Sequence, residues 1–404
     1  MKGVFRKCAF ALFASATMAG AGFMAPAAAQ QVIKLGISAP MSGAAAVWGQ
    51  GQEWAAQQAA EKVNAEGGVT VGGKKYTFEI VAYDNKYNAA DGTKVAQNLI
   101  NRDKIKYVVG SIGTAPIQAL QSLSERSGVI MFTSAWGKSV KGPQFPLTFT
   151  QSNTPFEILE PLYKYVLSKN PNAKTVAMIN ANDASGKEVE VVSQKVWASL
   201  GIKVLSSSWY ERGTTQFQPI AAKLTEQKPD IIDLGVAPPG DAGIILKELG
   251  VLGWNGVKVL PVGTSATQLV QIGGASANGT YMGYAGDYAS PLSSPIQQAL
   301  NLGMLKKLKE PLNPLQVSAY DSVLALKAGM EAANSLDPKV IAATLPKIIF
   351  ETSYGKTVFG SQAIYGSPQQ MQVPIMITQV QDGKMVELAR IIPDELKARL
   401  AAGK

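Results

Sequence analysis

Residues able to perform covalent chemistry are scarce in this chain, and their spacing does not form a catalytic site. The 404 residues include no histidine and a single cysteine, Cys8. Nucleophilic arrangements that need histidine therefore cannot form, and the usual zinc ligands are missing. Glu157 and Glu160 would share one helix face, a pattern typical of a solvated surface. No acidic residues follow the spacing of a calcium-binding loop, so we expect no catalytic residue, no metal and no cofactor.

Two glycine-containing segments resemble nucleotide-binding loops but lack essential residues. The segment 49–51 (GQG) follows a strand pattern and opens a helix, yet Trp54 stands where a dinucleotide fingerprint has its third glycine. The segment 185–188 (SGKE) resembles part of a phosphate-binding loop, but Glu188 replaces the hydroxyl residue. The sequence therefore argues against nucleotide binding.

Loops that follow apolar strand patterns hold the residues best suited to binding a small molecule. Trp48 lies in such a loop after residues 32–38, and Trp136 lies at the corresponding position after residues 129–133. A buried aromatic ring there could cover an apolar ligand, or it could simply pack at an interface between lobes. Thr114 is expected to be the N-cap of a helix, whose free N–H groups suit a carboxylate.

Alternating strand and helix patterns position these loops. Apolar, β-prone runs alternate with helical stripes such as the alanines between residues 52 and 65, and the alternation restarts after residue 155. This arrangement predicts two similar α/β lobes, each with a mainly parallel sheet covered by helices. Near the end, residues 373–380 and 385–388 flank Asp382-Gly383, which predicts a hairpin. Ligands of such sheets bind beyond the carboxyl ends of the strands.

The first 29 residues have the features of a secretory signal peptide. Three basic residues precede an apolar run over residues 8–24, and Ala27 and Ala29 occupy the small-residue positions of a cleavage site. We predict cleavage after Ala29, which removes Cys8 and leaves a chain without cysteine, as suits a bacterial periplasm. The formal charge of +9 falls to +6 without the three signal charges, and the remaining basic residues are scattered. Nucleic acid is therefore not an expected partner.

An ordered set of motifs resembles the leucine/isoleucine/valine-binding protein family. The segments are, in order, IKLGISAPMSGAAAVWGQ, AEKVNAEGG, FEIVAYDNKYNAADGTKVAQNLI, KYVVGSIGT, GVIMFTSA and SAYDSVLALKAGMEAA. These are type I periplasmic binding proteins, which deliver solutes to ABC importers. The resemblance covers essentially the whole mature chain and implies two doubly wound parallel-sheet lobes joined by three hinge crossings, with the solute trapped between the lobes.

The resemblance also implies where the lobes begin and end. The expected parts are a signal peptide over 1–29, an N-terminal lobe over 30–151 and 283–353, and a C-terminal lobe over 152–282 and 354–404. The expected hinge crossings lie near Thr150 to Asn153, Tyr281 to Asp287 and Ser353 to Lys356. We further expect a monomer that docks on a membrane permease.

The family's solute-contacting residues carry over only in part. Trp48 matches a family tryptophan that contacts the solute, and Thr114 matches a hydroxyl residue that holds the solute carboxylate. The loop after the fourth strand is here Ala135-Trp136-Gly137, so a hydroxyl is missing and a large ring is present. The candidate ligand-binding residues are Trp48, Gly113, Thr114, Ala135, Trp136, Gly137, Ser185, Ala237, Pro238 and Gly263.

The second lobe departs most from the family pattern. Ser185 and Ala237-Pro238 stand where the family has tyrosines, and Gly263 stands where it has the acidic residue that accepts an amino acid's ammonium group. A buried ammonium without a carboxylate is costly. The hypothesis is therefore a small organic acid, aromatic ones included, although Asp183 or Asp287 could replace the missing acid and keep amino acids open.

Three further interpretations concern how the solute is held and which other functions the sequence leaves open. The organic acid would be sandwiched between Trp48 and Trp136. An alternative function is a ligand-sensing subunit that presents its closed lobes to a membrane receptor. An exported carboxylate-dependent hydrolase on the same architecture is the enzymatic alternative, which the missing histidine and the missing pair of acids disfavour.

Overall fold

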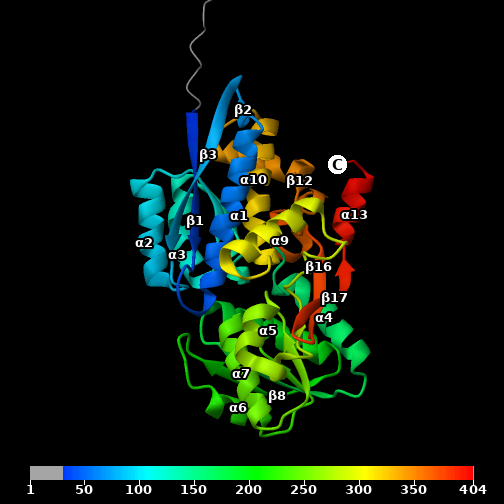
Figure 1. Cartoon of the computed structure of the whole chain (residues 1–404). Helices are drawn as coiled ribbons and strands as arrows, with labels where there is room; N and C mark the ends of the chain where they lie inside the picture. The colour runs from blue at the N-terminus through cyan, green and yellow to red at the C-terminus, as the bar shows by residue number, and fades with distance from the viewer. Residues whose placement is uncertain (1–30, 404) are drawn as a thin grey trace, which may run out of the picture. The chain divides into compact units, whose positions relative to one another are not determined.

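Two central β-sheets divide the protein into two lobes (Figure 1). The structure is a computed structural model that describes residues 31–403. The predicted signal peptide and its cleavage after Ala29 lie outside the described residues. The α/β class with two lobes is confirmed. In the described part of the chain, no helix combines the length and the apolar character that a membrane crossing requires.

The first sheet has the strand order β14-β15-β6-β5-β4-β1-β3-β2. Its strands are β1 (Gln31–Ala39), β2 (Val69–Val71), β3 (Lys74–Asp84), β4 (Tyr107–Ser111), β5 (Ile130–Thr133), β6 (Thr148–Thr150), β14 (Phe359–Gly360) and β15 (Gln370–Met371). The strand β1 lies between β3 and β4, parallel to both. Its apolar residues Leu35 and Ile37 are fully buried, as expected for a strand covered on both faces.

Helices cover both faces of the first sheet. On one face α1 (Ala46–Ala65) and α10 (Pro314–Ala333) lie side by side, because the small side chains of Ala55, Ala56 and Ala59 allow close approach. On the other face α2 (Ala89–Ala96), the π-helical segment η2 (Gln97–Arg102) and α3 (Thr114–Ser127) enclose a separate apolar cluster. Shorter or peripheral elements of this lobe are η1 (Gly43–Ala45), η3 (Lys138–Val140), α9 (Pro295–Leu308), α11 (Pro338–Thr344), η5 (Leu345–Lys347), β12 (Phe350–Thr352), β13 (Gly355–Thr357), α12 (Gln362–Tyr365) and α13 (Asp394–Ala401).

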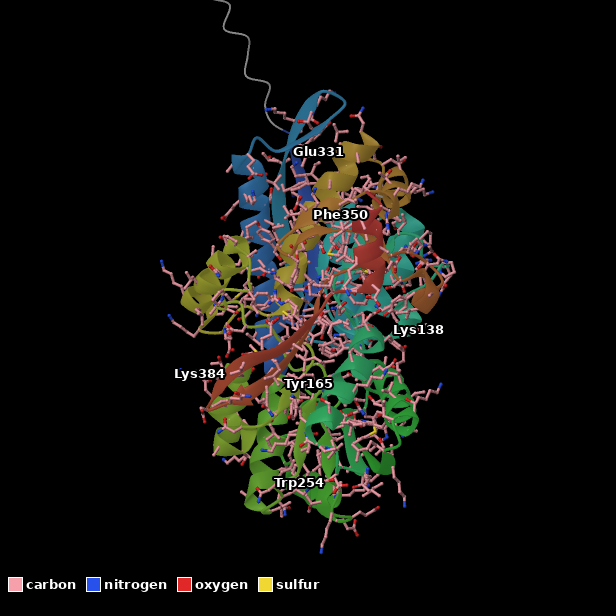
Figure 2. The ribbon with its side chains drawn as sticks, turned by 90° about the vertical axis from the view of Figure 1, so that its right-hand side faces the viewer. Lys138, Tyr165, Trp254, Glu331, Phe350 and Lys384 are labelled. Atoms are coloured by element: carbon pink, nitrogen blue, oxygen red, sulfur yellow. The ribbon has the colours of Figure 1, made fainter. Side chains whose placement is uncertain are left out.

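The second sheet has the strand order β17-β16-β11-β10-β9-β7-β8. Its strands are β7 (Thr175–Ala181), β8 (Lys203–Tyr210), β9 (Ile231–Asp233), β10 (Val257–Leu260), β11 (Tyr281–Met282), β16 (Ile375–Gln381) and β17 (Lys384–Ile391). Its helices are α4 (Pro155–Lys169), α5 (Ala184–Ser199), α6 (Gln218–Thr225), α7 (Pro239–Val251) and α8 (Ala266–Gly273), which the short η4 (Gly274–Ala277) follows. The predicted hairpin is confirmed as β16 and β17, and Asp382 and Gly383 both have positive φ in its turn. Figure 2 shows Lys384 at the tip of this hairpin.

The chain passes between the sheets three times. It leaves the first sheet after β6 and the second sheet after β11, and it passes from β15 of the first sheet to β16 of the second. The third passage lies between Met371 and Ile375, later than the expected Ser353 to Lys356.

The C-terminal segment from residue 354 was expected to lie wholly in the second lobe, and it does not. Only β16 and β17 of this segment pair with the second sheet, whereas β14 and β15 extend the first sheet through β6. The helix α13 also bonds to the segment around β14 in the first lobe. Arg399 donates to the carbonyl of Phe359 at 2.7 Å, and Glu395 accepts from the backbone N–H of Ser361 at 2.8 Å. The segment therefore belongs to both lobes.

Candidate functional site

The carboxyl ends of the first-lobe strands bring the candidate residues together where the two lobes meet. Trp48 lies in the first turn of α1, just after β1 and η1, while Thr114 follows β4 and Trp136 follows β5. All three side chains are buried. Their partners come from the second lobe and from the crossing segments, so the candidate site is shared by both lobes.

Aromatic rings form the center of this site. Trp48 and Trp136 are in edge-to-face contact, with ring centroids 5.5 Å apart and an interplanar angle of 74°. Tyr87 packs on Trp48 at 6.2 Å, and Tyr284 packs on Trp136 at 6.1 Å. The expected sandwich is therefore wrong, because two indoles in direct contact leave no slot for a solute ring between them.

Trp48 also joins the lobes through a hydrogen bond. Its indole Nε1–H donates to Oγ1 of Thr264, in the loop between β10 and α8, at 2.8 Å. Trp136 has a similar indole donor, but its Nε1 is buried and has no hydrogen-bond partner in residues 31–403. A buried donor of this kind usually has a partner, so Nε1 of Trp136 is an unsatisfied donor in this closed arrangement.

Thr114 joins the lobes as well, although it is not the N-cap residue. The N-cap of α3 is Gly113, at a φ of +95°, so the expected capping role of Thr114 is wrong. The Oγ1 atom of Thr114 accepts from Oγ of Ser185 in the second lobe at 2.9 Å and from the N–H of Gly137 at 2.9 Å. A Cβ atom at Gly137 would lie 2.5 Å from Thr114 Cγ2, so this approach requires glycine.

The remaining second-lobe candidates lie in buried loops. Ala237 is fully buried, and Pro238 is the N-cap residue of α7. Gly263 follows β10, and a Cβ atom there would lie 2.7 Å from both Cγ and Sδ of Met282. A larger side chain here would have to displace Met282, so the present packing fits glycine and not the acidic residue of the family pattern.

Neither Asp183 nor Asp287 is placed to accept the ammonium group of a solute. Asp183 is the N-cap residue of α5 and forms an ion pair with Nε of Arg212 at 2.5 Å. Asp287, half-buried after β11, accepts from the backbone N–H of Ala289 at 3.1 Å, and its side chain forms no hydrogen bond with Trp48 or Trp136 in the described part of the chain. Both carboxylate oxygens of Asp183 thus have a donor, the N–H of Gly186 and Nε–H of Arg212, and the hypothesis that Asp183 accepts a solute ammonium loses its support.

Charged residues that sequence reasoning did not single out lie at the junction of the lobes. Arg212 follows β8, and its guanidinium carbon lies 4.1 Å from the ring centroid of Tyr87 in the first lobe. Glu188 of α5 accepts from the backbone N–H of Ser139 at 2.9 Å and from its hydroxyl. Arg212 could have been found from the sequence, because it follows a strand pattern in the same way as Trp48 and Trp136.

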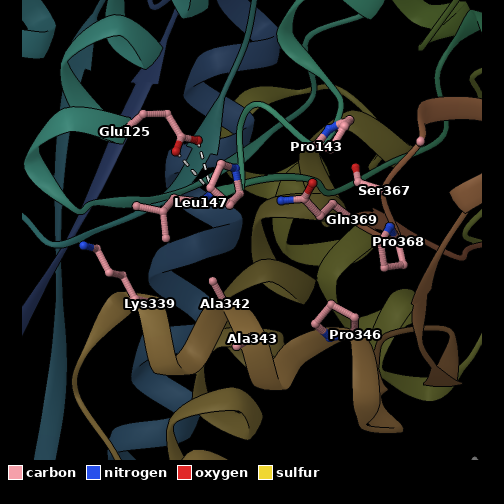
Figure 3. Close-up of a pocket in the computed structure, with 12 residues that line it drawn as sticks. Glu125, Pro143, Leu147, Lys339, Ala342, Ala343, Pro346, Ser367, Pro368 and Gln369 are labelled. Carbon is pink, nitrogen blue, oxygen red and sulfur yellow. Dashed lines mark hydrogen bonds between the residues drawn. The ribbon is translucent and has the colours of Figure 1, made fainter.

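Two cavities differ in their relation to the lobes. A cavity of about 300 Å³, here called the cleft cavity, is lined by residues of both lobes. Its lining residues are Ser42, Gly43, Ala44, Ala45, Lys86, Tyr87, Arg212, Gly213, Pro238 and Asp241. A larger cavity of about 680 Å³ lies on the first lobe, between α11 and the loops around residues 143–147 and 366–369 (Figure 3). Of the predicted ligand-binding residues, Pro238 lines the cleft cavity, and none lines the larger cavity.

A buried lysine orders the loop that carries Trp136. Nζ of Lys141 donates to the carbonyl of Ala135 at 2.8 Å and to Oγ1 of Thr150 at 3.1 Å. Burial lowers the pKa of Lys141 to about 8, although Glu157 and Glu188 act in the opposite direction. The lysine thus links the predicted loop to the first passage between the lobes.

This lysine should make stability depend on pH. Between about pH 8 and 10 the folded protein releases the proton of Lys141 while the unfolded chain retains it, so the free energy of unfolding should rise with pH. The full effect is roughly 3 kcal/mol. Denaturant unfolding of the wild type and of Lys141→Met should show the rise only in the wild type. The exposed Lys164, replaced in Lys164→Met, serves as the control and should keep it. Equal slopes in all three proteins would contradict the assignment.

Two α/β lobes that meet through residues at the carboxyl ends of their strands define a two-lobed small-molecule-binding protein. The chain belongs to the periplasmic binding protein family, whose family model matches residues 32–384. A relative from Pseudomonas aeruginosa, the leucine-, isoleucine-, valine-, threonine- and alanine-binding protein, is 26% identical over 345 residues, which cover 85% of this chain and 90% of the relative. The predicted resemblance to the leucine/isoleucine/valine-binding proteins is thus confirmed.

Solved structures have the same fold. The branched-chain amino acid transporter substrate-binding protein LivJ of Streptococcus pneumoniae, in complex with isoleucine, is 22% identical with a TM-score of 0.74, covering 90% of this chain and 99% of that chain. A solute-binding protein of an ABC transporter from R. palustris, in complex with benzoate, is 19% identical with a TM-score of 0.72, covering 90% and 97%. The fold therefore accommodates solutes of both kinds in these neighbours.

Proposed function

We propose that this chain is the periplasmic solute-binding component of an ABC uptake system of the branched-chain amino-acid type. It traps a small carboxylate-bearing solute between its lobes and delivers it to a membrane permease. The observation that carries the proposal is the direct pairing of strand-end residues across the lobes, Trp48 with Thr264 and Thr114 with Ser185. A solute that touches both lobes stabilises their closed arrangement, because only there are all its contacts made.

Binding and release, without covalent chemistry, are sufficient for this role. The relatives are solute-binding proteins, which favours a protein that is not an enzyme. Within residues 31–403 no group of three histidine, cysteine or acidic residues could hold a metal ion. We propose that the protein works as a monomer in the periplasm after signal-peptide cleavage.

The solute is proposed to be a small organic acid, with an amino acid as the alternative. A side chain at Gly263, where the family pattern has its ammonium acceptor, would have to displace Met282, and Asp183 is paired with Arg212. Asp241, on the cleft cavity, is then the acid that would have to accept an ammonium group, and its carboxylate already accepts from the hydroxyl of Tyr210 at 3.0 Å. An acid without an ammonium group avoids the cost of burying that charge.

Isothermal titration calorimetry with matched solutes tests this proposal. The panel contains benzoate, 3,4-dihydroxybenzoate, leucine and isoleucine, with benzamide as the neutral analogue of benzoate. We expect binding of a benzoate-type acid and weaker or no binding of the amino acids. Tight binding of leucine together with no binding of the aromatic acids would contradict the organic-acid proposal and leave the transport role standing. Mass spectrometry of any compound that copurifies with the protein extends the test beyond the panel.

A further inference from the structure

The cleft cavity is lined by one cationic side chain from each lobe, Lys86 and Arg212. The first lobe contributes residues 42–45, Lys86 and Tyr87, and the second lobe contributes Arg212 and Asp241 among others. A volume of about 300 Å³ lies at the lower end of the range of small-molecule pockets, roughly 300–1,000 Å³. The cavity is therefore large enough for one small solute or for one end of a longer one.

Arg212 is the main donor on the second-lobe side. A guanidinium has five N–H groups, and in residues 31–403 only Nε–H of Arg212 has an acceptor, Asp183 at 2.5 Å. Its Nη2 atom is buried without a hydrogen-bond partner. The ring of Tyr87 lies against the guanidinium, with the carbon 4.1 Å from the ring centroid. Asp183 and Tyr87 thus hold the side chain in place while its outer nitrogens stay free.

The N-terminus of α1 supplies donors from the first lobe. The short η1 leads directly into this 20-residue helix, and neither N-cap position has a side-chain capping bond. Ser42, the residue placed to cap, donates instead to Asp84 at 2.6 Å. Asp84 in turn accepts from the N–H groups of Met41 and Lys86, at 2.9 and 2.8 Å. The uncapped end retains its partial positive charge.

The acidic residues near the cavity leave donors of Arg212 without a hydrogen-bond partner. Asp183 faces the Nε side of Arg212, and the three donors just described hold Asp84. Asp241 lines the cavity and accepts from Tyr210, and burial raises the pKa of its carboxyl. Lys86 is exposed at the rim, and no acceptor binds its ammonium in the described part of the chain. An anion can thus bind to Arg212 without displacing an existing hydrogen bond.

We infer that the cleft cavity binds the carboxylate of the solute, held by the guanidinium of Arg212 and the uncapped N-terminus of α1. This inference rests on the proposed function and specifies it, because it assigns the anion to Arg212 instead of Thr114. Thr114 already bonds to Ser185 across the lobes and to Gly137 within its own lobe. The guanidinium of Arg212 can donate a charge-assisted hydrogen bond to a carboxylate, and Tyr87, Ala44 and Pro238 offer apolar surface to the body of the solute.

A charge-neutral double variant tests the inference. In Arg212→Met/Asp183→Asn both members of the ion pair are replaced, so no unpaired carboxylate remains, and asparagine still serves as the N-cap of α5. Calorimetry compares benzoate with its neutral analogue benzamide, and leucine with leucinamide, on the wild type and the variant. The wild type should prefer the carboxylate over the neutral amide, and the variant should lose that preference, with benzoate or leucine bound about tenfold or more weakly.

A second ion pair provides the matched control. Arg102 and Asp103 form an ion pair at 3.0 Å, at the end of η2 that leads into β4 and away from the cleft cavity. Arg102→Met/Asp103→Asn should bind the panel as the wild type does, and thermal unfolding checks that both variants are folded. If the Arg212 variant keeps the preference while Thr114→Val loses it, the assignment to Arg212 is overturned and the transport role stands. A wild type that binds only neutral solutes also overturns it, whereas one that binds no solute contradicts the proposed function itself.

Discussion

Replacing Trp48 with alanine is expected to weaken solute binding by about 1–3 kcal/mol, the range for a buried aromatic anchor at an interface. The ring is fully buried between Tyr87 and Trp136, and its Nε1–H donates to Thr264 of the other lobe at 2.8 Å. Alanine would remove the ring against which Tyr87, a lining residue of the cleft cavity, packs, and it would remove one bond between the lobes. Calorimetry with the panel solute that the wild type binds most tightly measures the loss. An unchanged dissociation constant would remove Trp48 from the site.

A pair of phenylalanine variants separates the ring from its hydrogen bond. Trp48→Phe keeps an aromatic ring but loses the bond to Thr264, so it should weaken binding by less than Trp48→Ala. Trp254 also donates through its indole, to the carbonyl of Pro229 at 3.1 Å, and it lies at the foot of the second lobe in Figure 2. Trp254→Phe therefore loses the same kind of bond far from the junction and should leave binding unchanged.

Much of the fold could be predicted because its signals are local. The apolar run of β1, the alanine stripe of α1 and the Asp382-Gly383 turn each act through residues close in sequence. The third passage between the lobes was misplaced for the opposite reason. The strands β14 and β15 have only two residues each, too few to show a period, and their membership of the first sheet depends on pairing with β6.

The candidate site was predictable in position but not in its contacts. The rule that ligands bind beyond the carboxyl ends of strands located Trp48, Thr114 and Trp136, which the structure brings together. Which partner each would meet could not be inferred, since Trp48 and Thr264 are 216 residues apart in sequence. Gly263 shows the same limit, because only packing against Met282 reveals that its side chain is excluded.

The largest effect on stability is expected at a buried acid within an apolar strand. Asp233, at the end of β9, accepts hydrogen bonds from the hydroxyl of Tyr163, from Nε1 of Trp197 at 2.9 Å and from the N–H of Gly235 at 2.9 Å. The rings of Tyr163 and Trp197 stack on each other, with centroids 3.7 Å apart. Asp233→Ala would leave the indole of Trp197 and the N–H of Gly235 without their acceptor and the hydroxyl of Tyr163 with only Ser193 as a partner. We expect the free energy of unfolding to fall by about 3–5 kcal/mol.

An exposed acid with equally many bonds isolates the contribution of burial. Asp230 also accepts three hydrogen bonds, from the N–H groups of Lys174 and Thr175 and from the Thr175 hydroxyl, at 2.8, 3.0 and 2.8 Å. Because it lies at the surface, water can replace its carboxylate, and Asp230→Ala should cost only about 1 kcal/mol. Denaturant unfolding of both variants measures the two losses. Similar losses would show that the number of hydrogen bonds, and not their burial, determines what each acid contributes to the second lobe.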